Sequence, residues 1–461
     1  MVPDQSEGRG SEPGRGTWLS TPTWHNRATD NGTRPVNHDL NIAALAVGSA
    51  CVIIWGLVSA RLERWDVSAP TAFVVLGLVV THGPTAIIHF NLHSSTIRSL
   101  AEVTLAIVLF ADASRVNVRA LRADAALPAR LLGIGLPLTI GAGAATAALL
   151  FGSNGLWVAA AIGAIVAPTD AALGASIMQD ERVPSGVRRL LNVESGLNDG
   201  IATPFVNLFI AGAVTTEAVS GTHLSKAVVE LVGGAALGIA VGVVGGVLLA
   251  LARRHGWSSP GVRPLAILAL ALFAYSTSVV AGTNGFIAAF VAGMAFGTVD
   301  HHNDEAALQF TEEAGTLLSL LVWFIFGAVM LVPGLEDLDW RDVVFALLAL
   351  TLLRMLPVAV ALAGTGLDRG TVAFVGWFGP RGLASVVFGL IAVDSLAPSE
   401  SKVVLAAITL TVALSVLLHG ISASPLAARY GAYASRLGPA GPQHTAAAPI
   451  SIRTLRRHQT L

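Results

Sequence analysis

One apolar stretch of the chain reads LLNVESGLNDGIATPFV and contains two carboxylates, a hydroxyl and an amide. On a helix, Ser195 and Asp199 share one face and Glu194 and Asn198 share the neighbouring face, because residues four apart lie one turn from each other. Hard monovalent cations prefer carboxylate, hydroxyl and carbonyl oxygens, by the same logic that governs calcium and magnesium. The spacing therefore predicts a helix that presents oxygen ligands to a cation.

Two other apolar stretches are interrupted at their centres. Pro168, Thr169 and Asp170 lie in the first stretch, AAIGAIVAPTDAALGASIM. Arg381 lies in the second stretch, FVGWFGPRGLASVVFGLI, where a proline precedes it and a glycine follows it. Proline removes a backbone donor and clashes with the carbonyl group four residues earlier, so both helices should break. The half-helix ends carry partial charges, and Asp170 and Arg381 have the signs that neutralise them. We expect the two broken helices to cross, with carbonyl groups near Thr169 as further ligands.

A further carboxylate lies at the end of the stretch LAIVLFAD. Asp112 is a candidate oxygen donor, and Glu102 on the same stretch is the alternative. An ionisable residue at bilayer depth costs at least about 2.5–3.5 kcal/mol, so each one is a functional candidate. Burial raises the pKa of a carboxylate toward neutrality, whereas a bound cation lowers it. We therefore expect Asp199 to bind a proton or a cation in turn.

The composition predicts that lipid surrounds these residues. Hydrophobic residues make up 53% of the 461 positions and charged residues 12%, whereas an ordinary globular chain carries about 25% charged residues. The net charge of −1 gives no sign of a nucleic-acid partner. A single cysteine, Cys51, excludes an internal disulfide. The chain is therefore predicted to be an all-α integral membrane protein in contact with membrane lipid.

Apolar runs of about 17–25 residues, together with shorter runs that tilt or thin the bilayer, predict about thirteen transmembrane helices. Their expected limits are Leu40 to Ala60, Ala69 to Gly83, Ile97 to Asp112, Leu127 to Phe151, Leu156 to Met178, Leu190 to Val214, Leu224 to Ala252, Pro264 to Ala281, Gly285 to Val299, Thr316 to Val332, Val343 to Gly364, Thr371 to Ala392 and Val403 to Pro425. Loops on the side of the C-terminus hold most of the Arg residues, which predicts a multi-pass protein of the cell membrane with the N-terminus outside and the C-terminus in the cytoplasm.

The chain divides into a membrane domain and two tails. Residues 1–39 are rich in Gly, Ser, Thr and Pro and are expected to form a disordered polar tail. The membrane domain is expected at 40–427, and residues 428–461 are expected to form a loose cytoplasmic tail. Within the domain, two six-helix sets at about 40–214 and 264–425 flank a linker helix at 224–252. The broken helices are the fifth and the twelfth, which is typical of an inverted-repeat transporter with its site at the midplane.

Several segments carry a resemblance to a known family. They are APTDAALGASIMQDERVPSGVRRLLNVESGLNDG, GTNGFIAAFVAG, LTLLRMLPVAVAL and WFGPRGLASVVFGLI. Together they resemble the monovalent cation:proton antiporters, in the sodium/proton exchanger branch that includes bacterial NhaP and animal NHE proteins. The likeness runs from about the first span to the thirteenth, and the TD, ESxxND and GPRGxxS motifs in this order are highly specific. The resemblance implies a secondary antiporter that acts in pH homeostasis and forms a homodimer.

The resemblance also implies which residues bind the ion. Asp199 matches the ion- and proton-binding aspartate, and Asn198 matches the asparagine of the ND pair that is typical of electroneutral members. Thr169 and Ser195 match cation-coordinating positions. Asp112 aligns with an acidic position on the third helix, although the spacing in LFADASRV is only loosely similar to the family pattern. The resemblance therefore implies a monovalent cation held by Asp199, Ser195 and Thr169, with Asp112 as a fourth ligand.

Four more residues match supporting positions. Asp170 and Arg381 match the residues that balance the crossed half-helices. Glu194 and Arg354 match a buried ion pair that braces the sixth helix against the eleventh. Because Arg354 would pair with it, Glu194 is expected to act as a brace and not as a carrier.

We therefore expect an electroneutral antiporter that exchanges sodium or lithium for a proton, with no cofactor beyond the transported ions. A potassium/proton antiporter of the same fold is the alternative. A cation channel is a further alternative, but the sequence lacks a repeated filter sequence or rings of pore-lining charge. An intramembrane enzyme is disfavoured because the sequence contains no HExxH, GxSxG or P-loop pattern.

Overall fold

The structure is a computed structural model that describes residues 42–86, 90, 92–115, 126–214, 221–299 and 305–437. Every regular element in these ranges is helical, so the expected all-α architecture is confirmed for the described part of the chain. The N-terminal tail expected at 1–39 and the part of the C-terminal tail after residue 437 lie outside the described residues.

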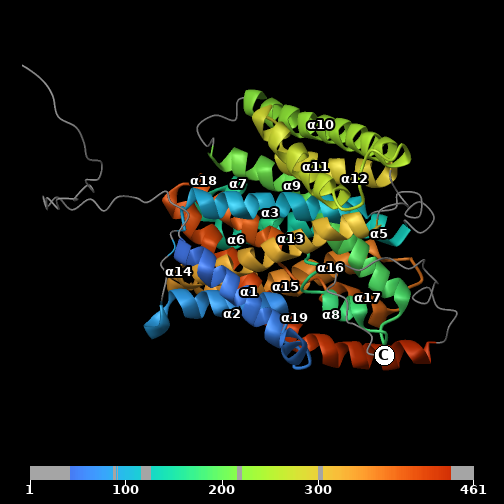
Figure 1. Ribbon diagram of the computed structural model, residues 1–461. Coiled ribbons are helices and arrows are strands. Elements are labelled where there is room, and N and C mark those ends of the chain that lie inside the picture. Colours follow the sequence, from blue (N-terminus) through green and yellow to red (C-terminus); the bar gives the residue numbers. More distant parts are fainter. Residues whose placement is uncertain are drawn as a thin grey trace, which may run out of the picture. The chain divides into compact units, whose positions relative to one another are not determined.

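The helices lie where the spans are expected, although the tenth begins at Glu305 and not at Thr316 (Figure 1). Their bounds are α1 Ile42–Glu63, α2 Ala69–Thr81, η1 Gly83–Thr85, α3 Ser95–Ser114, α5 Ala126–Arg130, η2 Leu131–Gly135, α6 Leu136–Phe151, η3 Gly152–Asn154, α7 Leu156–Ile165, α8 Ala175–Gln179, α9 Ser185–Val214, α10 Gly221–Arg254, α11 Arg263–Val280, α12 Gly285–Val299, α13 Glu305–Ile325, η4 Phe326–Met330, α14 Leu331–Glu336, α15 Trp340–Leu350, α16 Leu352–Ala361, α17 Arg369–Trp377, α18 Leu383–Ser395 and α19 Pro398–Arg436. Consecutive short elements form single segments, so the described chain contains the thirteen expected spans.

The helices pack into two groups. The first helix group contains α1–α3 and α10–α14, in which α3 packs against α11, α12 and α13. The second helix group contains α5–α9 and α15–α19, in which α7 packs against α6 and α9, and α18 packs against α19. Figure 1 shows α10, α11 and α12 together at the top and α15, α16 and α17 below α13. Helices α3 and α13 also contact α18, so they lie along the border between the groups.

Small residues allow close packing within the first helix group. Gly234, Gly238 and Gly242 recur every four residues on α10. A Cβ atom added at Gly238 would lie 2.6 Å from the carbonyl oxygen of Ala288, and one at Gly242 would lie 2.4 Å from that of Ala292. Stripes of small residues let membrane helices approach until their backbones touch. This glycine stripe therefore seats α12 on α10 within one chain.

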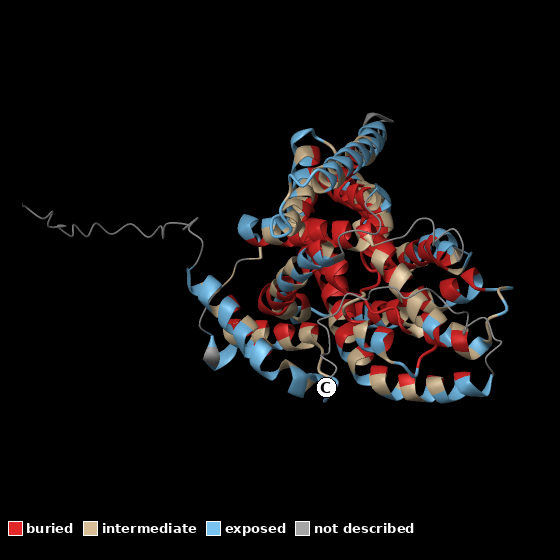
Figure 2. Ribbon diagram, turned by 45° about the vertical axis from the view of Figure 1, so that its right-hand side comes forward, coloured by how far each residue is buried: buried red, intermediate tan, exposed pale blue. Residues whose placement is uncertain are grey.

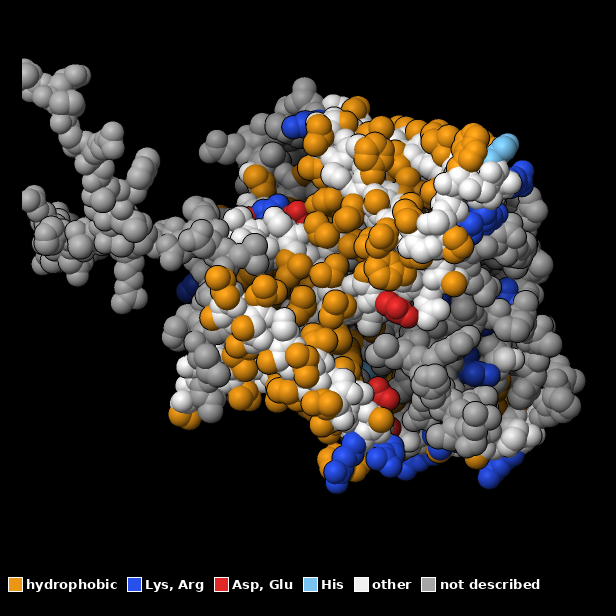
Figure 3. Space-filling model, viewed as in Figure 1, with side chains coloured by type: hydrophobic (Ala, Val, Ile, Leu, Met, Phe, Trp, Pro, Cys, Tyr) orange, Lys and Arg blue, Asp and Glu red, His pale blue; other side chains and the backbone are white. Residues whose placement is uncertain are grey.

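The outer helix faces suit a lipid environment. Among the described residues, eight helices are long and apolar enough to cross a membrane, and four shorter apolar helices accompany them. Buried residues concentrate where helices pack against each other, and exposed residues lie on the outer faces (Figure 2). Hydrophobic side chains cover much of the face seen in Figure 3, while Lys and Arg side chains lie mainly toward its right and lower margins. The chain is therefore a multi-pass membrane protein.

The last helix is longer than the sequence analysis expects. The sequence predicts a loose tail from residue 428, but α19 remains helical to Arg436. Tyr430 is buried, its ring stacks on that of Phe374 with centroids 4.0 Å apart, and its hydroxyl lies 2.9 Å from Oγ1 of Thr371. These contacts with α17 explain the correction, because they give the end of α19 a surface to pack on.

The N-terminus of α17 is also linked to the end of α19, through Asp368. Asp368 caps this helix by accepting hydrogen bonds from the backbone N–H groups of Gly370 at 2.8 Å and Thr371 at 3.1 Å. It also accepts a bond of 2.8 Å from the hydroxyl of Tyr433 on α19. Burial raises the pKa of Asp368, but hydrogen bonds from the Thr371 hydroxyl, from Tyr433 and from the two backbone N–H groups outweigh burial and lower the pKa below its ordinary value. The cap therefore contributes stability above the ordinary pKa and loses it only as the pH falls through the lowered value.

Candidate functional site

The two broken helices meet at their breaks. Helix α7 ends at Ile165 and α8 begins at Ala175, while α17 ends at Trp377 and α18 begins at Leu383. The backbone N–H of Asp170 in the first break donates to the carbonyl oxygen of Pro380 in the second, at 2.8 Å. The side-chain hydroxyl of Ser385 on α18 donates to the carbonyl oxygen of Ile165 at 2.6 Å. The expected crossing of the fifth and twelfth segments is thus confirmed.

Asp170 accepts hydrogen bonds at the N-terminal ends of α8 and α18, the half-helices that follow the two breaks. Its Oδ1 accepts hydrogen bonds from the N–H groups of Ala172 at 2.7 Å and Leu173 at 3.0 Å, in the turn that leads into α8. Its Oδ2 accepts a bond of 2.7 Å from the N–H of Leu383, the first residue of α18. A carboxylate stabilises the partial positive charge of helix N-termini, so one side chain balances two helix ends.

Arg381 binds carbonyl groups at the C-terminal ends of two helices. Its Nη1 donates to the carbonyl oxygens of Ala167 and, at 3.4 Å, Pro168, which follow the end of α7. Its Nη2 donates to the carbonyl oxygen of Ala349 on α15 at 3.1 Å. Arg381 is 1% exposed, so the guanidinium is enclosed by protein carbonyl groups. The arrangement agrees with the expected pairing of a base with helix C-termini.

The last carbonyl group of α17 has a histidine of α19 as its partner, a contact that the sequence did not predict. Nε2 of His419 on α19 lies 2.9 Å from the carbonyl oxygen of Trp377, the last residue of α17. The imidazole ring also stacks on the indole of Trp377 with centroids 5.2 Å apart. Because the two residues are 42 positions apart, no local sequence pattern signals this contact.

The glycines of the GPRG motif make room for charged side chains. A Cβ atom at Gly382 would lie 2.1 Å from Oδ2 of Asp170, and one at Gly379 would lie 2.4 Å from Nε of Arg354. Real Cβ atoms do not approach other atoms this closely, and neither glycine has a positive φ. Glycine is therefore required here by space and not by backbone conformation.

Helix α9 carries a polar cluster that differs from the pairs predicted from its spacing, because Asn198 joins Ser195 through Thr169 while Glu194 binds Arg354. Nδ2 of Asn198 donates to Oγ1 of Thr169 at 2.6 Å, and Oγ1 of Thr169 lies 3.0 Å from Oγ of Ser195. All three residues are buried. Within the described ranges, Oδ1 of Asn198 receives no hydrogen bond. The structure therefore brings Thr169, Ser195 and Asn198 together.

Asp199 lies next to this cluster on the border between the two helix groups. Its side chain is buried, with 9% of the residue exposed, and it lines a cavity of about 20 Å³. The second helix group contributes Asp170, Ala171, Ala172, Asp199 and Leu383 to the lining, and the first contributes Val108, Ser319 and Trp323. Side chains of both helix groups therefore border the cavity that Asp199 lines.

Asp112 on α3 lies against the same helix. A Cβ atom added at Gly196 on α9 would lie 3.8 Å from Cβ of Asp112, so Asp112 faces α9 one residue from Ser195. Asp112 is half-buried. The alternative carboxylate, Glu102, lies elsewhere: it accepts hydrogen bonds from Arg98 at 2.8 Å and from the hydroxyl of Tyr275 at 2.9 Å. Geometry thus places Asp112, and not Glu102, near the candidate site.

Glu194 and Arg354 form the buried ion pair implied by the resemblance. Nη1 of Arg354 donates to Oε1 of Glu194 at 2.5 Å, and Nη2 donates to Oε2 at 2.8 Å. Both residues are 3% exposed. The bidentate pair links α9 to α16.

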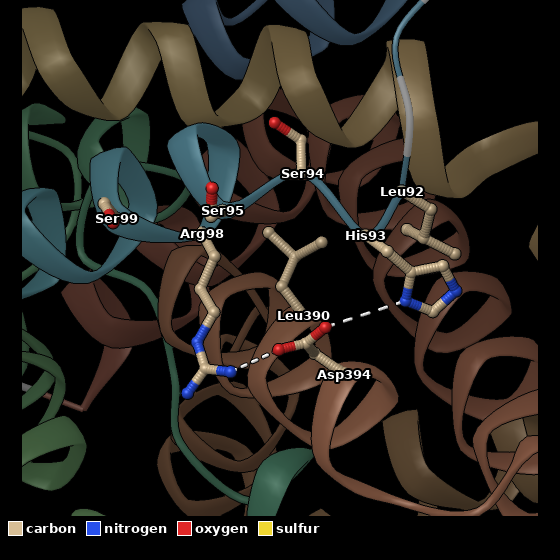
Figure 4. A pocket seen from close by; sticks show the side chains of 8 residues that line it. All are labelled: Leu92, His93, Ser94, Ser95, Arg98, Ser99, Leu390 and Asp394. Carbon is tan, nitrogen blue, oxygen red and sulfur yellow. Dashed lines mark hydrogen bonds and ion pairs between the residues drawn. The ribbon is translucent and has the colours of Figure 1, made fainter. Parts of the chain in front are cut away.

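A second polar cluster, at the far end of α18, was missed by sequence reasoning. A cavity of about 350 Å³ is lined by Leu92, His93, Ser94, Ser95, Arg98, Ser99, Leu390 and Asp394. Figure 4 shows Arg98 of α3 and His93 pointing toward the Asp394 carboxylate of α18 from opposite sides. This ion pair connects the two helix groups. No motif marks it, because Arg98 and Asp394 are 296 positions apart.

One protein-family profile matches most of this chain. The profile of the sodium/hydrogen exchanger family, transmembrane part, matches residues 47–429. The chain belongs to this exchanger family. The match covers both broken helices, α9 and the ion pair of Glu194 with Arg354.

Other exchanger relatives agree with this assignment. A Na(+)/H(+) antiporter of Schizosaccharomyces pombe is 26% identical over 295 residues, which is 57% of this chain and 62% of the relative. The K(+)/H(+) antiporter NhaP2 of Shewanella oneidensis is 23% identical over 352 residues, which is 75% of this chain and 59% of the relative. The chain therefore spans about three-fifths of the length of these exchangers.

A solved structure shares the exchanger fold. The sodium proton antiporter MjNhaP1 of Methanocaldococcus jannaschii superposes with a TM-score of 0.67 at 20% identity, covering 84% of this chain and 98% of that one. At this identity the likeness establishes the fold, which supports the crossed broken helices described above.

Proposed function

We propose that this chain is an electroneutral antiporter that exchanges sodium or lithium for protons across the cell membrane. The observation that supports the proposal most is the placement of Asp199. This carboxylate lines a cavity between the two helix groups together with Asp170 of the crossing, and it lies one helical turn after Ser195 on α9. A carboxylate with neighbouring hydroxyl and carbonyl oxygens is a suitable site for a hard cation.

Exchange follows from competition for one negative charge. In this proposal Asp199 binds a proton or a cation, and a bound cation excludes the proton because both neutralise the same carboxylate. One proton then replaces one monovalent cation, so a cycle moves no net charge. Thr169 and Ser195 supply oxygen ligands, and Asp112 is placed to approach from α3.

The neighbouring charges act as braces in this mechanism. Asp170 accepts three backbone hydrogen bonds, and Glu194 holds the bidentate bond from Arg354. Such charge-assisted bonds hold each carboxylate in a fixed position. Asp170, Glu194, Arg354 and Arg381 therefore fix the geometry of the crossing while Asp199 changes its occupant.

Transport requires the site to reach both sides of the membrane. Because Asp199 lies on the border between the helix groups, a rocking movement of one group against the other changes the side to which it is open. Arg98 and Asp394 join α3 to the end of α18, and α18 begins at the crossing. In this proposal the movement breaks the ion pair of Arg98 with Asp394. The ion pair then joins the two groups while the site is closed to the outer side of the membrane.

Potassium remains the alternative substrate, because one relative that matches is described as a K(+)/H(+) antiporter. In the described ranges, no three His, Cys, Asp or Glu side chains gather into a metal-binding group. A site of one carboxylate with neutral oxygens suits a monovalent ion of either kind. A homodimer, with the N-terminus outside and the C-terminus in the cytoplasm, completes the proposal.

A fluorescence assay in proteoliposomes tests the exchange. With an acidic interior, adding sodium, lithium or potassium in turn should dequench a trapped pH dye for each transported cation. We expect a response to sodium and lithium, and no accompanying current across a planar membrane. A cation-dependent current without an imposed proton gradient would instead indicate a channel.

A further inference from the structure

A cluster of ionisable side chains joins the first turns of α3 to the end of α18. Arg98 on α3 donates to Glu102 at 2.8 Å and also binds Oδ2 of Asp394 on α18. Nδ1 of His93, which precedes α3, lies 3.7 Å from Oδ1 of the same carboxylate. Figure 4 shows the two basic side chains on opposite sides of Asp394. Because they reach different oxygens, both can bind Asp394 at once.

The charges of this cluster are unequal while His93 is neutral. The carboxylates of Glu102 and Asp394 carry two negative charges, and Arg98 carries one positive charge, which leaves a net charge of −1. Tyr275 of α11 donates its hydroxyl to Glu102 and adds no charge. A proton on His93 makes the cluster neutral. The surroundings of His93 therefore favour its protonated form electrostatically.

The surrounding solution reaches the histidine. The side chain of His93 is 60% exposed and that of Asp394 is 36% exposed, and both line the cavity of about 350 Å³. Histidine is the side chain that ordinarily changes its charge between about pH 5 and about pH 8. The solution on this side of the membrane therefore sets the charge of His93 without a proton passing through the site at Asp199.

We propose that His93 binds a regulatory proton from the outer solution, and that this proton strengthens the contact that closes the outer side. The inference rests on the proposed function, on its orientation and on the closing role of Arg98 with Asp394. Protonated His93 gives Asp394 a second cationic partner, so α3 and α18 separate less readily. Outer acid then lowers the population of the outward-open state, and the apparent affinity for outer sodium falls with that population.

Substitutions that fix the charge at position 93 test this role. His93→Gln stays neutral at every pH, and His93→Lys stays positive. His82→Gln is the control, because His82 follows α2 on the same side of the membrane and its Nδ1 contacts a hydroxyl, that of Thr81 at 2.8 Å. Right-side-out membrane vesicles that contain each full chain take up radioactive sodium at a constant inner pH, which gives the apparent KM at several outer pH values.

Comparison at equal pH removes the effect of proton competition at Asp199, which all these proteins share. At an outer pH of about 5, the KM of wild type should be about threefold above that of His93→Gln, as for one exposed ion pair. At about pH 8 the two should agree, because His93 is then neutral. His93→Lys should keep the threefold higher KM at both pH values, and His82→Gln should follow wild type.

Equal KM values for wild type and His93→Gln at both pH values would overturn the inference. A His93→Lys variant that behaves as His93→Gln would also overturn it, because a fixed positive charge would then have no effect. So would a His82→Gln variant that reproduces the result of His93→Gln, since any outer histidine would then serve.

A distance measurement keeps this test independent of transport. Spin labels on cysteines at Thr96 of α3 and Ser399 of α19, both exposed, follow the separation of the helix ends in a chain that carries Cys51→Ala and Asp199→Asn. Acidification should shift the distances toward the closed state, and adding His93→Gln should remove the shift. Distances that do not change with pH would contradict the role of His93. If wild type exchanged no cation, the proposed function would fail while this shift could still be measured.

Discussion

Replacing Asp199 with asparagine should abolish proton-gradient-driven sodium uptake, reducing it to the level of protein-free liposomes. Asparagine has nearly the same shape, so the polar cluster around Thr169 and Ser195 should persist. It cannot carry the negative charge for which a proton and a cation compete, and a neutral amide therefore leaves no exchange. Uptake of radioactive sodium into proteoliposomes with an acidic interior measures the effect.

The control for this variant is an aspartate away from the membrane core. Asp337 follows α14, its side chain is 82% exposed, and it lies 3.7 Å from Lys402. Asp337→Asn makes the same chemical change and should transport sodium at the wild-type rate. If Asp199→Asn retained transport close to that of Asp337→Asn, Asp199 would have no place in the mechanism.

The second large effect concerns the ion pair of Glu194 with Arg354. Glu194→Gln or Arg354→Ala should each destabilise the protein by about 3–5 kcal/mol, because each leaves one buried charge without its partner. The midpoint of thermal unfolding in detergent should fall sharply for both variants. The double variant Glu194→Gln with Arg354→Ala leaves no unpaired charge, so its loss of stability should be smaller than the sum of the losses in the two single variants.

This double-mutant comparison also separates a brace from a carrier. If Glu194 braces α9 against α16, a folded double variant should keep measurable exchange at a reduced rate. Single variants as stable as wild type, or a double variant whose loss equals the sum of the singles, would contradict a coupled buried pair.

Much of the fold could be predicted from local sequence. Long apolar runs gave the helical segments, and Pro168 with the GPRG motif located both breaks, because a proline has the same backbone consequence wherever it occurs in a helix. The charges of Asp170 and Arg381 indicated the crossing, since opposite partial charges meet there. Helix periodicity alone placed Ser195 and Asp199 on one face.

Contacts between distant segments could not be predicted in this way. His419 satisfies the end of α17, and Trp323 approaches Asp199 from the other helix group, yet neither lies in a local pattern. The chain from residue 428 onward is expected to be loose, because it contains PAGPQHTAAAP and a basic end. The end of α19 is instead ordered by Tyr430, whose partners lie on α17. Such contacts depend on the packing of helices, which sequence spacing does not encode.

The dependence of the apparent KM for sodium on pH tests most directly whether a proton and a cation take turns on one carboxylate. Wild-type protein in proteoliposomes should show a KM that rises about tenfold for each unit of decrease in pH on the acidic side, while saturating sodium restores the maximal rate, because one proton is displaced for each cation bound. A KM that stays constant across the same pH range, with only the maximal rate falling, would contradict competition at Asp199.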